Sequence, residues 1–184
     1  MNGANVVWYK QTINNACGLS ATLHAACNGD ARDSILSNSH LSRLLGVCAP
    51  LSQSERARVI EEDVDLDAVY KSVAQQGDSE VPESPEHVVD FHYVYLVKSH
   101  TNGQLYELGG DKQEPVDMGA LGSDEDVLSV AGLGVFEGLS SGKESELVII
   151  SAYSCWHLDN LNFQIKAGAF PGHLYNIYIY ILDN

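Results

Sequence analysis

The chain has 184 residues, of which 45% are hydrophobic, and this suits one globular domain with a sizeable core. It carries 25 Asp and Glu against 10 Lys and Arg, for a formal net charge of −15. An acidic surface of this kind repels phosphates and attracts basic proteins, so DNA and RNA are excluded as expected partners. Charge alone does not separate attraction for a basic partner from simple solubility.

The sequence predicts neither a secretory signal nor a membrane span. The first ten residues, MNGANVVWYK, contain no apolar stretch behind a basic cluster, and no apolar run reaches the length of a bilayer. The four cysteines, at positions 17, 27, 48 and 155, form no CxxC pair. This argues against a structural zinc site and against a disulfide framework. We therefore expect a reduced, cytoplasmic monomer that binds no membrane and uses no metal or cofactor.

An apolar helix is predicted near the N-terminus. Asn14 and Asn15 are common helix-starting residues, and 28–29 is an Asn-Gly pair that ends helices. Between them, apolar residues recur at helical spacing, at Leu19, Leu23 and Ala26. The pattern predicts a helix over about 17–27, and the apolar run before it, at 6–9, suits a short strand.

Two further helices are predicted before a polar loop. The first covers 34–45. The second covers 52–73, where Ser52 and Glu55 fit a capping box ahead of an approximate apolar face. Residues 74–87 are polar and rich in proline and glycine, which indicates a surface loop.

The second half of the chain is predicted to contain strands. Residues 89–98 and 104–110 are rich in β-branched and aromatic residues and flank a Thr-Asn-Gly turn, which predicts a hairpin. Residues 115–139 suit loop and helix, and 147–153 suits a short buried strand. Strands mixed with helices in this way indicate an α+β domain.

Cys17 is the strongest candidate for a reactive thiol. It stands where the predicted helix begins, and the unpaired N–H groups of a helix N-terminus stabilise a thiolate. Cys27 lies at the far end of that helix, where the dipole disfavours a thiolate. Cys48 falls in a predicted loop and Cys155 outside the regular pattern. The alternative is that Cys17 is an inert core residue, as most cysteines are.

A cysteine nucleophile also needs a general base and donors for the oxyanion. His92 is the histidine embedded in a strongly strand-like run, so it would be held rigidly. His24 follows Leu23 on the predicted helix and either packs or faces solvent. Four others fall in loop or tail sequence: His87, His100, His157 and His173. Gln11 precedes Cys17 by six residues, and its amide could join the Cys17 backbone N–H as an oxyanion donor.

Four blocks of sequence resemble the ubiquitin carboxyl-terminal hydrolases, the UCH family of papain-like thiol proteases. Residues 11–18 (QTINNACG) and 23–25 (LHA) are similar to that family's active-site segment. Residues 54–58 (SERAR) are similar to a helical segment, 89–93 (VDFHY) to the histidine strand, and 103–108 (GQLYEL) to the strand after it. Because four ordered blocks are far more specific than any one, the chain is identified as a member of this family.

The resemblance implies a papain-like UCH fold, in which helices flank an antiparallel sheet, and a deubiquitinating function. Cys17 matches the nucleophile, His92 the general base and Gln11 the oxyanion-hole glutamine. Cys17 would attack the carbonyl of ubiquitin's C-terminal glycine, and water would release the acyl-enzyme. Residues 74–87 match the crossover loop, under which the basic tail of ubiquitin or a ubiquitin-like modifier would thread, and an acidic chain suits that tail.

One departure from the family pattern concerns the residue that orients the histidine. The family reads Tyr-Glu-Leu-Asp-Gly, and the matching residues 106–110 place Gly109 where the aspartate belongs. Asp111 would share a face with Gly109 in an extended strand but lie about 7 Å along it, beyond hydrogen-bond reach unless the two glycines let the chain buckle. The alternatives are a solvated turn aspartate and, for the whole chain, a catalytically impaired ubiquitin-binding module.

The two ends of the chain also depart from the family. Only ten residues precede Gln11, where the family carries a strand of the sheet, so we expect the N-terminal part of the fold to be missing. We divide the chain into a UCH-like catalytic domain at 1–154 and an atypical tail at 155–184. Residues 175–182 alternate Tyr and Ile as an edge strand does and could replace the missing strand. The alternative is an inaccurate gene model.

Overall fold

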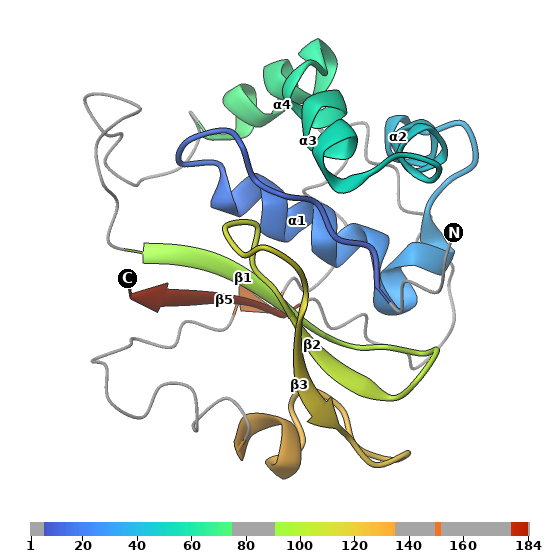
Figure 1. Cartoon of the computed structure of the whole chain (residues 1–184), viewed down its shortest axis with the longest axis vertical. Coiled ribbons are helices and arrows are strands. Elements are labelled where there is room, and N and C mark those ends of the chain that lie inside the picture. Colours follow the sequence, from blue (N-terminus) through green and yellow to red (C-terminus); the bar gives the residue numbers. More distant parts are fainter. Residues whose placement is uncertain (1–5, 75–90, 135–149, 152–177, 184) are drawn as a thin grey trace.

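The computed structural model describes residues 6–74, 91–134, 150–151 and 178–183 (Figure 1). Its helices are α1 (Cys17–Cys27), the 3-10 helix η1 (Gly29–Ser34), α2 (His40–Cys48), α3 (Gln53–Glu61) and α4 (Val64–Ala74). Its strands are β1 (Phe91–Lys98), β2 (Gln104–Leu108), β3 (Val116–Ala120), β4 (Ile150–Ser151) and β5 (Tyr178–Asp183). The predicted α+β class is confirmed.

Helix α1 lies between the sheet and the other helices (Figure 1). On one side, its Leu19 and Leu23 belong to a buried cluster shared with α2, α3 and α4. The residues that those helices contribute are Leu41, Leu44, Cys48, Ile60 and Leu66. On the other side, Ala25 packs with Tyr95 and Leu108 of the hairpin. Because α1 is buried on both sides, its N-terminal end is held in a fixed position against the sheet.

The five strands form one antiparallel sheet in the order β3-β2-β1-β5-β4. Strand β1, which carries His92, is therefore the middle strand. The alternation over 175–182 predicted an edge strand, and this is wrong, because Ile179 pairs with Tyr95 of β1 and also with Ile150 of β4. Alternation along one strand does not reveal how many neighbours that strand has.

The predicted hairpin is confirmed in strands β1 and β2. Tyr95 lies opposite Leu108, and Lys98 lies opposite Leu105. Gly103 ends the turn with a φ of 72°, a left-handed conformation that glycine adopts without steric cost. The hairpin fixes which residues of β2 and of the segment after it come close to β1.

The predicted helix over 17–27 is confirmed by α1. The helix predicted over 34–45 has the wrong bounds. Asn38 has a φ of 67°, and α2 begins only after Ser39, whose Oγ accepts a hydrogen bond from the backbone N of Ser42. A left-handed residue interrupts a right-handed helix, so α2 starts beyond the serine that caps it.

The long helix predicted after Ser52 is two helices. The capping box of Ser52 and Glu55 is confirmed at the start of α3. The chain then breaks at Asp63, whose Oδ1 accepts a hydrogen bond from the backbone N of Leu66 at the start of α4. The other carboxylate oxygen of Asp63 lies 2.7 Å from Nε2 of His40 on α2. A local cap, which the apolar spacing did not show, divides the helix.

One further strand prediction is wrong, and one strand was not predicted. The apolar run at 6–9 is no strand, and the side chain of Asn28 instead bonds both the backbone N and the backbone O of Val7. Residues 116–120, predicted within a loop, form β3. Most side chains of β3 are exposed, so the segment has no apolar alternation from which a strand could be predicted.

Some predicted segments lie outside the described residues. These are 75–87 of the polar loop, most of the strand predicted over 147–153, and the proposed boundary between domains at residue 154, which stays a prediction. Within the described part of the chain, no helix combines the length and the apolar composition needed to cross a membrane.

Candidate active site

Cys17 is the first residue of α1 and is half-buried. Its N-cap, Ala16, has no side-chain acceptor for the N–H groups of the first turn. Those groups therefore point toward the start of the helix unbonded by a capping side chain, and they favour a negative charge there. The hydroxyl of Tyr70 on α4 lies nearby, 3.8 Å from the position that a Cβ on Gly18 would take.

His92 faces Cys17 from strand β1. The two side chains lie close enough for each to act on the ionisation of the other. The side chain of His92 is only 13% exposed, and neighbouring residues of its strand are paired on both sides by β2 and β5. The fold thus brings together two predicted site residues that are 75 positions apart in the sequence, and it holds the imidazole on the middle strand of the sheet.

The surroundings shift the pKa of each partner toward the charged form. Burial acts to raise the pKa of the Cys17 thiol, but hydrogen bonds from His92, Tyr93 and Gly18, together with the His92 charge, outweigh it and leave the pKa below its ordinary value. The pKa of His92 is raised, first by the hydrogen bond with Cys17 and then, against burial, by the charge of Asp111. Both shifts favour a thiolate–imidazolium pair, in which the sulfur is already nucleophilic.

Asp111 lies on the other side of the imidazole. Its Oδ1 is 3.0 Å from Nε2 of His92. This is an ion-pair distance, although the ring N–H is not aligned with the carboxylate and Nε2 makes no hydrogen bond of good geometry within the described part of the chain. Hydrogen bonds in unliganded active sites are commonly misaligned, and a small rotation of the ring would direct the N–H at the carboxylate.

The condition under which Asp111 was expected to reach His92, a buckled chain at Gly109 and Gly110, is met. The pairing of β1 with β2 ends at Tyr95 and Leu108, and the chain then turns at 110–111. This turn, and not an extended strand, brings the carboxylate of Asp111 to the imidazole. Asp111 is the one site residue that the predicted set of Cys17, His92 and Gln11 left out.

Gln11 lies beside the turn that carries Asp111. Its backbone N donates to the O of Gly110 at 2.8 Å, and its side-chain Nε2 donates to the O of Ile13 at 3.0 Å. Its Oε1 is buried without a hydrogen-bond partner among the described residues. The loop before α1 thus fixes the amide in one orientation while using only one of its two N–H hydrogens.

His24 is a core residue. Its ring is fully buried, with Nδ1 3.0 Å from the O of Leu108 and Nε2 3.0 Å from the N and 3.1 Å from the O of Tyr9. A neutral ring with its hydrogen on Nδ1 donates to the O of Leu108 and accepts from the N of Tyr9 at Nε2, and it gives no hydrogen to the O of Tyr9. Burial lowers the pKa of His24 to about 4, so the ring is neutral at pH 7. His24 joins three segments of the fold and takes no part in the Cys17 site.

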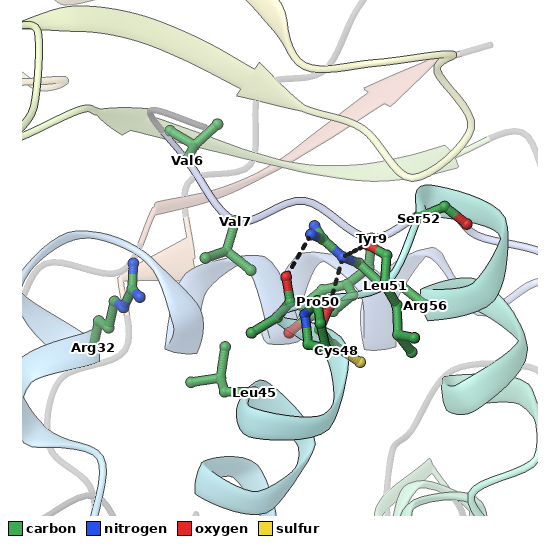
Figure 2. A pocket seen from close by; sticks show the side chains of 11 residues that line it. Val6, Val7, Tyr9, Arg32, Leu45, Cys48, Pro50, Leu51, Ser52 and Arg56 are labelled. Carbon is green, nitrogen blue, oxygen red and sulfur yellow. Dashed lines mark hydrogen bonds between the residues drawn. The ribbon is translucent and has the colours of Figure 1, made fainter. Parts of the chain in front are cut away.

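A separate cavity lies away from this site. It measures about 430 Å³, and none of Cys17, His92 and Asp111 lines it. Figure 2 shows it between the N-terminal segment and helices α2 and α3, with the guanidinium of Arg56 directed at backbone carbonyls. Arg56 Nε donates to the O of Cys48 at 2.9 Å, near the C-terminal end of α2. Arg56 thus satisfies carbonyls that a helix end leaves unpaired, which is a structural role.

The sequence matches the family described as ubiquitin carboxyl-terminal hydrolase, family 1, over residues 1–135. It is 39% identical over 120 residues to a ubiquitin carboxyl-terminal hydrolase of Aplysia californica, a match that covers 65% of this chain and 55% of that protein. It is 33% identical over 123 residues to ubiquitin carboxyl-terminal hydrolase isozyme L1 of Homo sapiens, covering 67% and 52% respectively. The chain spans about half the length of these relatives.

The fold is also similar to a solved structure. The crystal structure of the Trichinella spiralis UCH37 catalytic domain bound to ubiquitin vinyl methyl ester superposes with a TM-score of 0.59, covering 97% of this chain and 64% of that one. The sequence identity is 20%, so this likeness concerns the fold, and it confirms the UCH fold that the sequence predicted. The chain belongs to family 1 of the ubiquitin carboxyl-terminal hydrolases.

Proposed function

We propose that the chain hydrolyses the bond at the C-terminal glycine of ubiquitin, with Cys17 as nucleophile, His92 as general base and Gln11 in the oxyanion hole. The observation that carries the proposal is that the fold places Cys17, at the start of α1, beside His92, on the middle strand. A lowered thiol pKa beside a raised imidazole pKa is the electrostatic state that a thiol hydrolase needs at neutral pH.

The reaction would proceed in two steps. The Cys17 thiolate attacks the carbonyl carbon of the glycine, and the C=O electron pair moves to oxygen. As the adduct collapses, the bond to the leaving group breaks and His92 gives its proton to that group, leaving a thioester. His92 then takes a proton from water, the resulting hydroxide adds to the thioester, and Cys17 leaves as the thiolate.

The developing oxyanion would be bound by two kinds of donor. One is the backbone N–H of Cys17, which no capping side chain occupies. The other is the side-chain amide of Gln11, of which one hydrogen is given to the O of Ile13 and the second remains for the oxyanion. The bond to Ile13 orients the amide before substrate binds.

Ubiquitin as the partner is supported by two further observations. The Trichinella spiralis relative was solved bound to a ubiquitin vinyl methyl ester. The present chain carries a formal net charge of −15, which suits association with the basic tail of ubiquitin. A ubiquitin-like modifier with a similar tail is the other partner that these properties admit.

A fluorogenic ubiquitin C-terminal amide tests the proposal. The chain should release the fluorophore, and Cys17→Ala should reduce the rate to background. Cys27→Ala is the matched control, because it removes a buried thiol of the same helix and should keep most of the activity. Turnover that does not exceed the Cys17→Ala background, or equal loss in both variants, contradicts the proposal.

The second candidate is a ubiquitin-binding module without activity. It is favoured by Gly109, which stands where the family pattern has its aspartate, and by the lack of an aligned hydrogen bond at His92 Nε2. This candidate predicts that the chain binds ubiquitin while an electrophilic ubiquitin probe leaves Cys17 unmodified. Covalent labelling that maps to Cys17 excludes it.

A further inference from the structure

We propose that Asp111 is the positioning residue for His92, and that the Gly109–Gly110 turn carries its carboxylate into the space that a side chain at position 109 would fill. This inference rests on the proposed function, since it assigns a residue to the same site. It goes beyond the family resemblance, which implies an aspartate at position 109 and gives no role to position 111.

A side chain at position 109 would point into the space beside His92 that the carboxylate of Asp111 occupies. A Cβ placed on Gly109 would lie 2.7 Å from Oδ1 of Asp111 and 3.5 Å from Cγ1 of Val94. The same Oδ1 lies 3.0 Å from Nε2 of His92. A carboxylate branching from position 109 would therefore reach the point that Asp111 already occupies. The two positions compete for one volume beside the imidazole.

The turn is fixed by hydrogen bonds to three consecutive carbonyls. The O of Leu108 accepts from His24 Nδ1 at 3.0 Å, and the O of Gly109 accepts from Trp8 Nε1 at 2.9 Å. The O of Gly110 accepts from the backbone N of Gln11 at 2.8 Å. The donors come from α1 and from the N-terminal segment and are mostly buried, so the turn has one conformation where strand β2 ends.

Gly110 allows this close approach because it has no side chain. A Cβ at this position would lie 2.8 Å from Cβ of Gln11 and 3.0 Å from Cβ of Ser20 on α1. Neither neighbour is the end of a flexible side chain. The chain can therefore turn against the start of α1 only with glycine at 110, and the turn brings Asp111 back toward β1.

The charges around the imidazole are consistent with this role. Cys17 and Asp111 contact His92, and Glu107 on β2 also acts on it electrostatically. Lys112 Nζ lies 3.9 Å from Oδ2 of Asp111 and 4.0 Å from Oε1 of Glu107. The carboxylate of Asp111 is thus closer to His92 than to its neighbouring lysine, which argues against a purely solvated turn residue.

Moving the carboxylate back to position 109 tests the proposal. Asp111→Ala and Asp111→Asn should lower kcat by about 3- to 10-fold with little change in KM, a modest loss because Asp111 is half-exposed. The double variant Gly109→Asp/Asp111→Ala should recover most of the loss. Gly109 has no positive φ, so an aspartate fits its backbone. Gly109→Ala/Asp111→Ala, which adds only a methyl group, should not recover it.

A second readout separates failure of this inference from failure of the proposed function. Asp111→Asn should lower the His92 pKa, followed by NMR of the imidazole, and move the alkaline limit of the pH–rate profile to lower pH. Asp124→Asn removes the same charge from an exposed loop and should change neither. If Asp111→Asn leaves the His92 pKa unchanged, or the relocated aspartate restores neither pKa nor rate, the inference is wrong. An inactive wild type with a responsive His92 pKa contradicts only the proposed function.

Discussion

The two ends of α1 carry the same residue in opposite chemical states. At the N-terminal end, Cys17 is half-buried beside His92 and has a lowered thiol pKa. At the C-terminal end, Cys27 is buried 3.9 Å from the hydroxyl of Tyr9, and burial raises its thiol pKa to about 12. The difference shows that position along the helix and the partner it meets decide whether a cysteine is reactive.

The pKa values of His92 and His24 are also shifted in opposite directions. His92 meets a thiol and a carboxylate, and its pKa is raised. His24 meets three backbone groups in the core, and its pKa falls to about 4. The region around Cys17 and His92 favours the charged forms of these side chains. The region around His24, further along helix α1, favours the neutral form of its ring.

The largest expected effect comes from replacing each histidine by alanine. Because it removes a general base, His92→Ala should lower ubiquitin-amide hydrolysis by about 10²- to 10⁴-fold. It should leave the free energy of unfolding nearly unchanged. His24→Ala should cost about 3 to 5 kcal/mol of unfolding free energy, because it leaves a cavity and removes the hydrogen-bond partner of backbone groups of Tyr9 and Leu108. Activity assays and urea unfolding measure the two outcomes. If both variants lost activity and stability to the same extent, the division into two regions would be contradicted.

Acid should weaken the core region through His24. Its pKa is about 4 in the folded protein against an ordinary value of 6.5. In this window the unfolded chain binds a proton that the folded chain does not, so stability is fully present above pH 6.5 and falls as the pH drops toward 4. The loss from this residue is about 3 kcal/mol. Urea unfolding at several pH values measures it, and His24→Gln should show a shallower fall over the same range.

A smaller effect is expected from adding one methyl group where the two regions meet. Gly110→Ala places a Cβ 2.8 Å from Cβ of Gln11, so it should cost about 1 to 3 kcal/mol and also lower activity. Gly46→Ala is the control. Nothing lies within 4 Å of the Cβ that this change adds at an exposed position of helix α2, and it should stabilise the protein by about 0.5 to 1 kcal/mol. Equal stability of the two variants in thermal unfolding would show that the turn at Gly110 tolerates a side chain.

Local signals predicted much of the fold. The apolar spacing and the Asn-Gly pair after Cys27 predicted the bounds of α1, although its N-cap is Ala16 and not an asparagine. The capping box at Ser52 and the hairpin were also predicted from local signals. The resemblance supplied the pairing of Cys17 with His92, which helical spacing alone does not contain.

The features that sequence reasoning missed depend on contacts between distant segments. The inner position of β5 needs β4 as a second partner, and the break before α4 needs the side chain of Asp63 as a cap. The distance from Asp111 to His92 depends on the turn at 110–111, which is held by contacts with the N-terminal segment and α1. Strand periodicity assumes an extended chain and carries no information on such a turn.

The pH dependence of Cys17 alkylation tests the central claim most directly. Iodoacetamide modification of each cysteine, resolved by peptide mass mapping, reports the ionisation of each thiol without any substrate. The account predicts that Cys17 reacts with a midpoint below the ordinary thiol pKa of about 8.5, that Cys27 stays unmodified in the folded protein, and that His92→Ala raises the Cys17 midpoint. A Cys17 midpoint at or above that value, unchanged by His92→Ala, would contradict the account.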